Sequence, residues 1–210
     1  MSNMFKEKGY EVVKGLLEPG FIEFIHEYVY TKIRGGVDAN VLYGDPQSPN
    51  SFALYGDALM DTILSMSCKM MSDISGRNLL PTYSYTRLYQ QGGELKAHTD
   101  RDSCEISATL ALGYPDEINP IYFSTKPKDK VLEEGDPEAT EILLEPGDLC
   151  LYRGCELTHW RPPFESDWYL QTFMHLIDAN GPYKDQIYDY RDYLGMKSNN
   201  PNLLNYTHSN

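Results

Sequence analysis

The sequence is short of cysteine, of basic residues and of long apolar runs. It holds four cysteines, Cys68, Cys104, Cys150 and Cys155, and they form no Cys-x-x-Cys pair. This argues against a disulfide framework and against a cysteine-based zinc site, so we expect reduced thiols. No run reaches the roughly 18 uncharged apolar residues of a membrane span, and Met1–Lys14 lack the pattern of a signal peptide. These absences favour a cytoplasmic protein without a membrane segment.

Basic residues are the scarcer charge. Lys and Arg total 18 against 31 Asp and Glu, which gives a formal net charge of -13. A protein that binds duplex nucleic acid needs a cationic face to displace the counterions of the phosphates. An anionic membrane surface also attracts basic segments. We therefore expect a small-molecule or peptide substrate and neither nucleic acid nor a membrane as partner, whereas the oligomeric state stays open.

The N-terminal part has the apolar periodicity of helices. The chain's 210 residues are enough for one domain, and we find no internal repeat. Apolar side chains recur every three to four residues over Phe21–Ile33 and again from about Phe52 to Ser75, where Gly76 follows. This spacing predicts two helices. We expect residues 1–78 to form a helical layer that supports the rest of a single domain, 1–210.

Beyond Pro81 the period changes to two. Apolar and polar residues alternate over Tyr83–Tyr89 and Ile106–Leu112, which indicates strands. Shorter strands are expected at about 121–124, 141–144 and 149–152, and a longer one at 168–176. Short strands separated by Pro and Gly, without helices between them, predict a barrel or jelly roll. We expect an α+β, mainly β protein with a β core over 79–178. The extension over 179–210 is expected to pack through four tyrosines and then to fray; these are Tyr183, Tyr188, Tyr190 and Tyr193.

His98-Thr99-Asp100 is the first feature that carries chemistry. Residues two apart on an extended segment point the same way, so His98 and Asp100 can hold one metal ion together. His159 lies beyond a gap that holds roughly four short strands, enough to return to the same end of a barrel. Two His and one carboxylate on one face of a metal leave positions open for other ligands, as in non-haem Fe(II) oxygenases. Arg161 is two residues past His159 and carries the planar fork that pairs with a carboxylate.

These residues lie within a longer resemblance to a known family. The stretch GRNLLPTYSYTRLY (76–89), then Gly92-Gly93, then His98-Thr99-Asp100-Arg101, resembles the start of the catalytic barrel of Fe(II)- and 2-oxoglutarate-dependent dioxygenases. The prolyl-4-hydroxylase-like branch is the most similar. The stretch EPGDLCLY (145–152), which leads to His159, is similar to the strand before the distal His of that family. The resemblance covers about 79–178.

The resemblance implies a double-stranded β-helix in which His98, Asp100 and His159 bind Fe(II) and 2-oxoglutarate chelates the iron through its keto acid. Tyr89 matches a family Tyr that hydrogen-bonds this co-substrate. With O2, 2-oxoglutarate would be decarboxylated to succinate and CO2 while a C–H bond is hydroxylated. The branch implies a prolyl or other peptide side chain, or a free amino acid, as substrate. Ascorbate is compatible as an accessory reductant.

One departure concerns the far carboxylate of 2-oxoglutarate. The branch usually has Arg or Lys about ten residues past the distal His, but Asp167–Gln171 contains no base. We expect Arg161 to replace it, with Arg87 as the second choice, although Arg87 on a barrel-facing strand also fits a structural pair with a carboxylate. Gly35–Ser51 and Pro115–Ala139 are candidate lids, because long polar connections near a site often gate it.

Two other functions stay open on the same barrel. The missing base fits a non-catalytic metal-binding or structural protein with a degenerate co-substrate site. A metalloenzyme on a cupin-like barrel that needs no keto acid is the other. Binding of 2-oxoglutarate that weakens in Arg161→Ala would argue against the first, and turnover without 2-oxoglutarate would favour the second.

Overall fold

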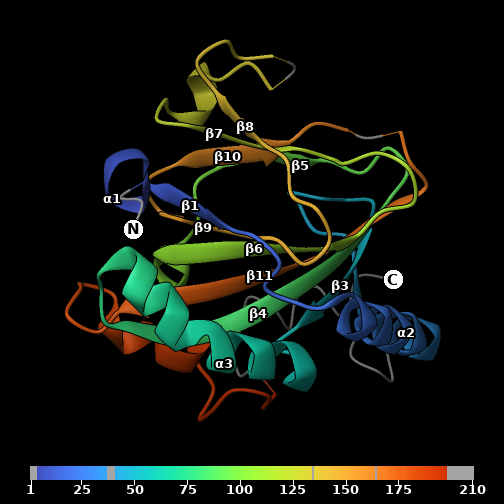
Figure 1. Ribbon diagram of the computed structural model, residues 1–210, viewed down its shortest axis with the longest axis horizontal. Helices are drawn as coiled ribbons and strands as arrows, with labels where there is room; N and C mark the ends of the chain where they lie inside the picture. The colour runs from blue at the N-terminus through green and yellow to red at the C-terminus, as the bar shows by residue number, and fades with distance from the viewer. Residues whose placement is uncertain (1–3, 37–40, 134, 164, 198–210) are drawn as a thin grey trace.

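The protein folds as two antiparallel sheets that face each other, with helices on one outer side (Figure 1). The computed structural model describes residues 4–36, 41–133, 135–163 and 165–197. The helices and strands are α1 (Met4–Lys8), β1 (Tyr10–Val13), α2 (Pro19–Gly35), β2 (Val41–Tyr43), β3 (Ser51–Tyr55), α3 (Ala58–Ser75), β4 (Leu79–Gln90), β5 (Leu95–His98), β6 (Ile106–Gly113), β7 (Ile121–Ser124), β8 (Thr140–Ile142), β9 (Leu149–Tyr152), β10 (Thr158–Arg161) and β11 (Trp168–Asp178). Short 3-10 helices cover Asp102–Cys104, Lys128–Lys130 and Lys184–Asp189.

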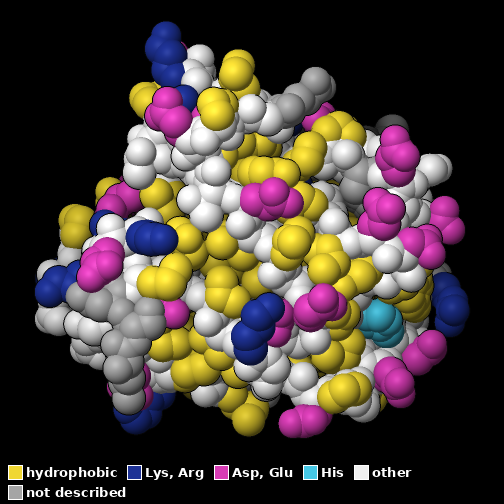
Figure 2. All heavy atoms as spheres, turned by 45° about the horizontal axis from the view of Figure 1, so that its top comes forward, with side chains coloured by type: hydrophobic (Ala, Val, Ile, Leu, Met, Phe, Trp, Pro, Cys, Tyr) yellow, Lys and Arg dark blue, Asp and Glu magenta, His cyan; other side chains and the backbone are white. Residues whose placement is uncertain are grey.

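The larger sheet has the strand order β1-β9-β6-β11-β4-β3-β2 and the smaller one β5-β10-β7-β8. Helices α2 and α3 lie against the outer face of the larger sheet (Figure 1). No described helix is long and apolar enough to span a membrane. On the face in Figure 2, the Lys and Arg side chains of the described residues are scattered among acidic ones.

Side chains on the central strands of the larger sheet point alternately to the helices and to the interior between the two sheets. On β6, Ala108, Leu110 and Leu112 join the apolar core beneath the helices. Their neighbours Ser107 and Thr109 are also fully buried, but they point to the interior between the sheets, where they hydrogen-bond to other side chains. A strand buried on both faces therefore has one apolar face and one polar face. Ser107 on this polar face contacts the site described below.

The predicted β core is confirmed, and the expectation for residues 1–78 is too simple. This segment supplies two long helices, but also β1, β2 and β3, all in the larger sheet. The second helix begins at Ala58 rather than Phe52, because Asp57 caps it by accepting a hydrogen bond from the Leu59 amide at 3.0 Å. The residues before it, Ser51–Tyr55, pair with β4 as a strand. Tertiary pairing therefore overrides the helical periodicity there.

The C-terminal segment is held by charge and by part of the expected tyrosine packing. Tyr183 and Tyr188 are half-buried, whereas Tyr190 and Tyr193 are each 58% exposed; Arg191 is buried. Its guanidinium lies 2.6 Å from Asp61 of α3 and donates to the Thr82 carbonyl of β4 at 2.8 Å. This ion pair fastens the segment to both the helical layer and the larger sheet. The predicted fraying concerns residues that lie outside the described ones from 198 onwards.

Candidate metal centre and cavity

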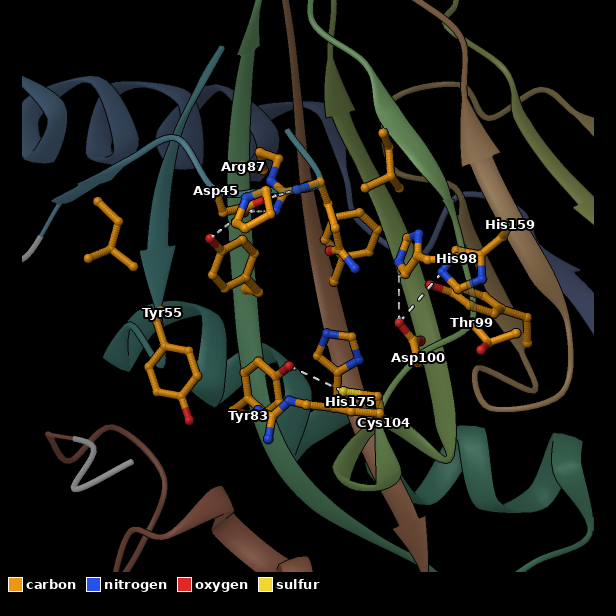
Figure 3. Close-up of a pocket in the computed structure, with 18 of the residues that line it drawn as sticks. Asp45, Tyr55, Tyr83, Arg87, His98, Thr99, Asp100, Cys104, His159 and His175 are labelled. Atoms are coloured by element: carbon orange, nitrogen blue, oxygen red, sulfur yellow. Dashed lines mark hydrogen bonds and ion pairs between the residues drawn. The ribbon is translucent and has the colours of Figure 1, made fainter. Parts of the chain in front are cut away.

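Two adjacent strands of the smaller sheet bring two histidines together. His98 ends β5 and is the register partner of His159 on β10, and their ring centroids are 4.3 Å apart. Asp100 follows β5, and its Oδ1 lies 3.6 Å from the Nε2 of each histidine. One ligand atom from each of the three residues lies within 4.8 Å of the others. His98 and His159 are far apart in the sequence but lie together at one end of the barrel, as expected from the strands between them (Figure 3).

Backbone carbonyls set the orientation of both imidazoles. The Nδ1 of His98 contacts the Lys96 carbonyl at 2.7 Å, and the Nδ1 of His159 contacts the Leu157 carbonyl at 2.9 Å. A carbonyl oxygen only accepts, so each Nδ1 carries the hydrogen and each Nε2 keeps a lone pair. Hydrogen bonds of this kind orient histidine ligands in metal sites. Both Nε2 atoms face Asp100 Oδ1.

Asp100 is oriented in a similar way. Ser107 on β6 donates its hydroxyl hydrogen to Asp100 Oδ2 at 2.6 Å. The other carboxylate oxygen, Oδ1, faces the two histidines. Burial alone would raise the pKa of Asp100, but the neighbouring imidazoles, His159 foremost, hold this pKa well below its usual range. Burial, and next the proximity of His159, lowers the pKa of His98. The donor set is two imidazole nitrogens and one carboxylate, which suits Fe(II), Zn(II) or related ions.

The three residues line a cavity of about 410 Å³ between the two sheets (Figure 3). Its opposite wall comes from β3, β4 and β11 and is largely aromatic. The aromatic residues there are Tyr55, Tyr83, Tyr85 and Phe173. Gly44–Gln47 also line it, so the first candidate lid lies at the cavity, whereas no described residue of Pro115–Ala139 lines it. A volume of this size suits a small molecule or a single side chain.

Arg161 lies inside the barrel rather than on the cavity wall. It is 1% exposed, and its guanidinium donates to the Gln171 side-chain oxygen at 2.7 Å and to the Asn119 carbonyl. The guanidinium also lies over the Tyr169 ring, 4.8 Å from its centroid. Its Nε has no hydrogen-bond partner, and no acidic side chain of the described residues forms an ion pair with it. Arg161 is therefore a buried cation with only neutral partners.

The other two predicted co-substrate residues lie on β4. Tyr89 is fully buried and accepts a hydrogen bond from Gln171 Nε2 at 3.1 Å, so Gln171 links it to Arg161. Arg87 lines the cavity and forms an ion pair with Asp45. The structural pair considered for Arg87 from the sequence is thus present. The three residues are linked through one chain of contacts: Gln171 joins Arg161 to Tyr89, and Arg87 also donates to the Tyr89 hydroxyl at 3.5 Å. Arg87 differs from Arg161 in having an acidic partner, Asp45.

Sequence reasoning missed several polar residues of the interior. Asp45 and Ser107 stand in no motif, and a histidine on a strand, such as His175, is more often a core residue than a ligand. His175 in fact lines the cavity. A usable signal existed for β11, where Gln171 and His175 share the parity of Phe173 on one face of a buried strand. The acidic partner of Arg101, Asp189, is distant in sequence and carries no such signal.

Comparisons with known proteins show the fold. No protein-family model matches the sequence, and no curated protein does. A prolyl-4-hydroxylase from Pseudomonas putida is 14% identical, with a TM-score of 0.63 over 84% of this chain and 96% of that chain. The alpha ketoglutarate dependent carbocyclase SnoK from nogalamycin biosynthesis is 13% identical, with a TM-score of 0.65 over 84% and 82%. HygX from Streptomyces hygroscopicus, solved with nickel and 2-oxoglutarate, is 14% identical, with a TM-score of 0.63 over 84% and 85%. The predicted double-stranded β-helix is confirmed.

Proposed function

We propose that this protein is an Fe(II)- and 2-oxoglutarate-dependent oxygenase that hydroxylates a C–H bond of a small molecule or a single side chain. O2 and 2-oxoglutarate are consumed, one oxygen atom enters the substrate and the other enters succinate, and CO2 is released. One observation carries the proposal. A donor set of His98, Asp100 and His159 opens onto a cavity, and a buried guanidinium without an acidic partner lies two residues along the same strand.

The three ligand residues fit the metal in number, type and protonation. His98 and His159 would each bind through Nε2 and Asp100 through Oδ1, because their other polar atoms are engaged by the protein. Fe(II) bound there supplies a Lewis acid for the keto acid and a centre for O2 activation. The contribution of the chain is to fix the ligands and to exclude water from the interior.

Arg161 is the group that would anchor the far carboxylate of 2-oxoglutarate. A buried guanidinium without an acid is costly, and a bidentate carboxylate is the ligand that compensates it best. Gln171 occupies the fork of Arg161 with its side-chain oxygen and presents its nitrogen to Tyr89. An incoming carboxylate would replace these neutral contacts. Arg87 is the weaker choice, because Asp45 already neutralises it.

The structural relatives support this interpretation of the cavity. HygX has been solved with nickel, 2-oxoglutarate and hygromycin B, and SnoN with Fe3+, alpha ketoglutarate and nogalamycin RO. A viral collagen prolyl hydroxylase has been solved as a 2OG complex. These are properties of those proteins. For this chain they favour a metal and a keto acid in the barrel, with a second substrate in the aromatic part of the cavity.

The first experiment is anaerobic. Fe(II) and then 2-oxoglutarate are added to the purified protein, and the visible charge-transfer absorption of an iron-chelated keto acid is recorded. We expect the band in wild type, no band in Asp100→Ala, and an unchanged band in Asp102→Ala, which alters an exposed acid two residues away. Arg161→Met should weaken 2-oxoglutarate binding about 100-fold, as for the loss of one partner of a buried charge pair. Arg87→Met should change it less than about threefold, as for a charge already paired with a protein carboxylate.

Each alternative has its own outcome. Metal binding without the keto-acid band, together with turnover of a second substrate, would favour an enzyme that needs no 2-oxoglutarate. Metal binding with neither band nor turnover would favour a structural protein with a degenerate site. A band that survives in Asp100→Ala would contradict the proposed ligand set.

A further inference from the structure

His175 is a buried cavity residue that the proposed chemistry does not use. It lies on β11, is 5% exposed, and lines the cavity between Tyr83 and Asp100 (Figure 3). Its ring centroid is 4.5 Å from that of Tyr83 and 6.2 Å from that of Phe173. The imidazole therefore lies among the aromatic rings that form the wall opposite the donor set.

Ser107 determines which nitrogen of His175 carries the hydrogen. The Ser107 hydroxyl contacts Asp100 Oδ2 at 2.6 Å and His175 Nδ1 at 2.8 Å. A carboxylate only accepts, so the one hydroxyl hydrogen goes to Asp100 and the Ser107 oxygen accepts from His175 Nδ1. Burial lowers the pKa of His175 to about 4, so the ring is neutral near pH 7. A neutral ring with hydrogen on Nδ1 has a lone pair on Nε2.

The Nε2 lone pair of His175 differs from the other polar groups of this wall in its hydrogen bonding. His175 Nε2 has no hydrogen-bond partner among the described residues. The neighbouring tyrosine hydroxyls are engaged: Tyr83 with Cys104 at 3.2 Å and Tyr85 with Asp45 at 3.1 Å. Tyr55 donates to Asp189. An acceptor that a buried side chain turns towards a cavity, without a protein partner, is available to a donor on the ligand.

The charges on the wall favour a neutral donor. Arg87 and Arg101 both line the cavity, and a bound divalent metal would add positive charge opposite them. The acids nearby are already used, Asp45 by Arg87, Asp189 by Arg101 and Asp100 by the donor set. An ammonium group would find no unpaired carboxylate among these acids, whereas a hydroxyl group needs none. The rings of Tyr83 and Phe173 pack against His175 and make the surroundings of its imidazole largely apolar.

We propose that His175 Nε2 accepts a hydrogen bond from a hydroxyl group of the primary substrate, which is a neutral, hydroxyl-bearing cyclic small molecule. This deepens the proposed function and rests on it for the reaction, while the binding contact itself can be tested without turnover. His175 is then a specificity-determining residue. It touches the substrate at a point away from the predicted co-substrate anchor at Arg161.

The experiment measures binding of a panel of cyclic polyols, each paired with the analogue that lacks one hydroxyl and with a cyclic amine of the same ring size. Calorimetry uses wild type loaded with Zn(II) and 2-oxoglutarate, and wild type without either. We expect at least one polyol to bind about tenfold tighter than its deoxy analogue, the effect of one neutral hydrogen bond. The amine should bind more weakly than the polyol.

Two variants test the acceptor. His175→Phe keeps a ring but removes the acceptor, and should lose the same factor of about ten while Zn(II) and 2-oxoglutarate affinities stay within about twofold. His175→Gln places a side-chain amide at the same depth and should recover most of the loss. In His175→Phe the polyol and its deoxy analogue should bind equally, a result that a merely structural role of the ring does not produce.

Three outcomes would overturn the assignment: no polyol binds wild type, the deoxy analogue binds as well as the parent, or His175→Phe retains the preference for the hydroxyl. Failure of the proposed function looks different. In that case the keto-acid band is missing in the Fe(II) experiment, while the arm without metal and 2-oxoglutarate still reports the contact with His175.

Discussion

Two buried arginines, Arg191 in the C-terminal segment and Arg161 in the barrel interior, have opposite electrostatic surroundings. The contact of Arg191 with Asp61 is called the C-terminal clamp below. Arg191 lies 2.6 Å from Asp61 and also donates to three backbone carbonyls, so its charge is fully compensated. Arg161 is also buried but meets a side-chain amide oxygen, a carbonyl and an aromatic ring. The first arrangement fastens two parts of the chain together. The second leaves the positive charge of Arg161 without an acid, and an anionic ligand would neutralise it.

The difference separates a charge that the fold compensates from one that it does not. A compensated pair contributes to the fold and needs nothing further, whereas an uncompensated charge is retained at a cost in stability. His175 offers a third solution, since it stays buried by remaining neutral. The three residues respond differently to mutation, to pH and to ligand, and each response can be measured.

The largest effect is expected at the clamp. Asp61→Ala leaves Arg191 buried without its acid and should lower the free energy of unfolding by about 3–5 kcal/mol. Asp61 also accepts hydrogen bonds from Ser84 and Gly195, which lose their partner as well. Urea denaturation followed by circular dichroism measures the change. The matched control is Asp73→Ala, which removes an exposed pair with Lys69 and should cost less than about 0.5 kcal/mol. Equal costs at both sites would refute the structural role of the clamp.

The next effect concerns pH. Burial lowers the pKa of His175 to about 4 from an ordinary value near 6.5, so the unfolded chain binds a proton at this residue before the folded one does. Its contribution is therefore fully present above about pH 6.5 and should fall by roughly 3 kcal/mol as pH drops to about 4. Denaturation midpoints between about pH 7 and pH 4 measure this slope. His175→Phe should remove the share of His175 and leave that of His98, whose pKa burial also lowers. An unchanged slope in that variant would assign the pH dependence to other groups.

A third effect has the opposite sign to the first. Arg161→Met exchanges an uncompensated charge for an apolar side chain and should raise the stability of the ligand-free protein by about 1–2 kcal/mol. Arg191→Met, the matched substitution, should lower it, because Asp61 then loses its buried partner. Adding a fixed concentration of 2-oxoglutarate to the Zn(II)-loaded protein should stabilise wild type more than Zn(II)-loaded Arg161→Met, as thermal melts can show. Destabilisation by both substitutions would make Arg161 a structural residue like Arg191.

How much of this could be predicted depends on the range of the interactions. Alternation indicated β4, β6 and β11, and the spacing of His98, Asp100 and His159 indicated a shared face, because both signals are local or follow from barrel closure. The strands that carry the two histidines, β5 and β10, are only four residues each and were not predicted. Their pairing with each other is a tertiary property.

The charge partners were the hardest part to predict. Arg87 was expected to need a carboxylate, but Asp45 lies 42 residues earlier in a loop without periodicity. Asp61 and Arg191 are 130 residues apart, and neither stands in a motif. Only the folded chain shows which arginine is compensated and which is not. The missing base near Gln171 pointed to Arg161 as a carboxylate anchor, but the absence of an acid beside Arg161 depends on tertiary contacts that no local pattern encodes.

The smallest effect would come from making Arg87 resemble Arg161. Asp45→Asn removes the acid from Arg87 but keeps the shape of the loop, and Arg87 retains its contacts with the rings of Tyr85 and Tyr89. The Arg87 side chain is only 4% exposed, but it lines the cavity, so water held there can reach the freed charge, and we expect a loss of about 1 kcal/mol in stability. Affinity for 2-oxoglutarate should change less than about threefold, as expected for a group outside the anchor.

The informative variant combines both changes. The double variant Arg161→Met/Asp45→Asn lacks the Arg161 charge and leaves Arg87 without its acidic partner. Arg87 faces the cavity rather than the barrel interior. If charge alone recruits the keto acid, this variant should recover much of the binding lost in Arg161→Met. We expect recovery of no more than about threefold, because Arg87, although 3% exposed, faces the cavity, where water screens its charge. Recovery to near wild-type affinity, measured by the same charge-transfer titration, would move the anchor to Arg87.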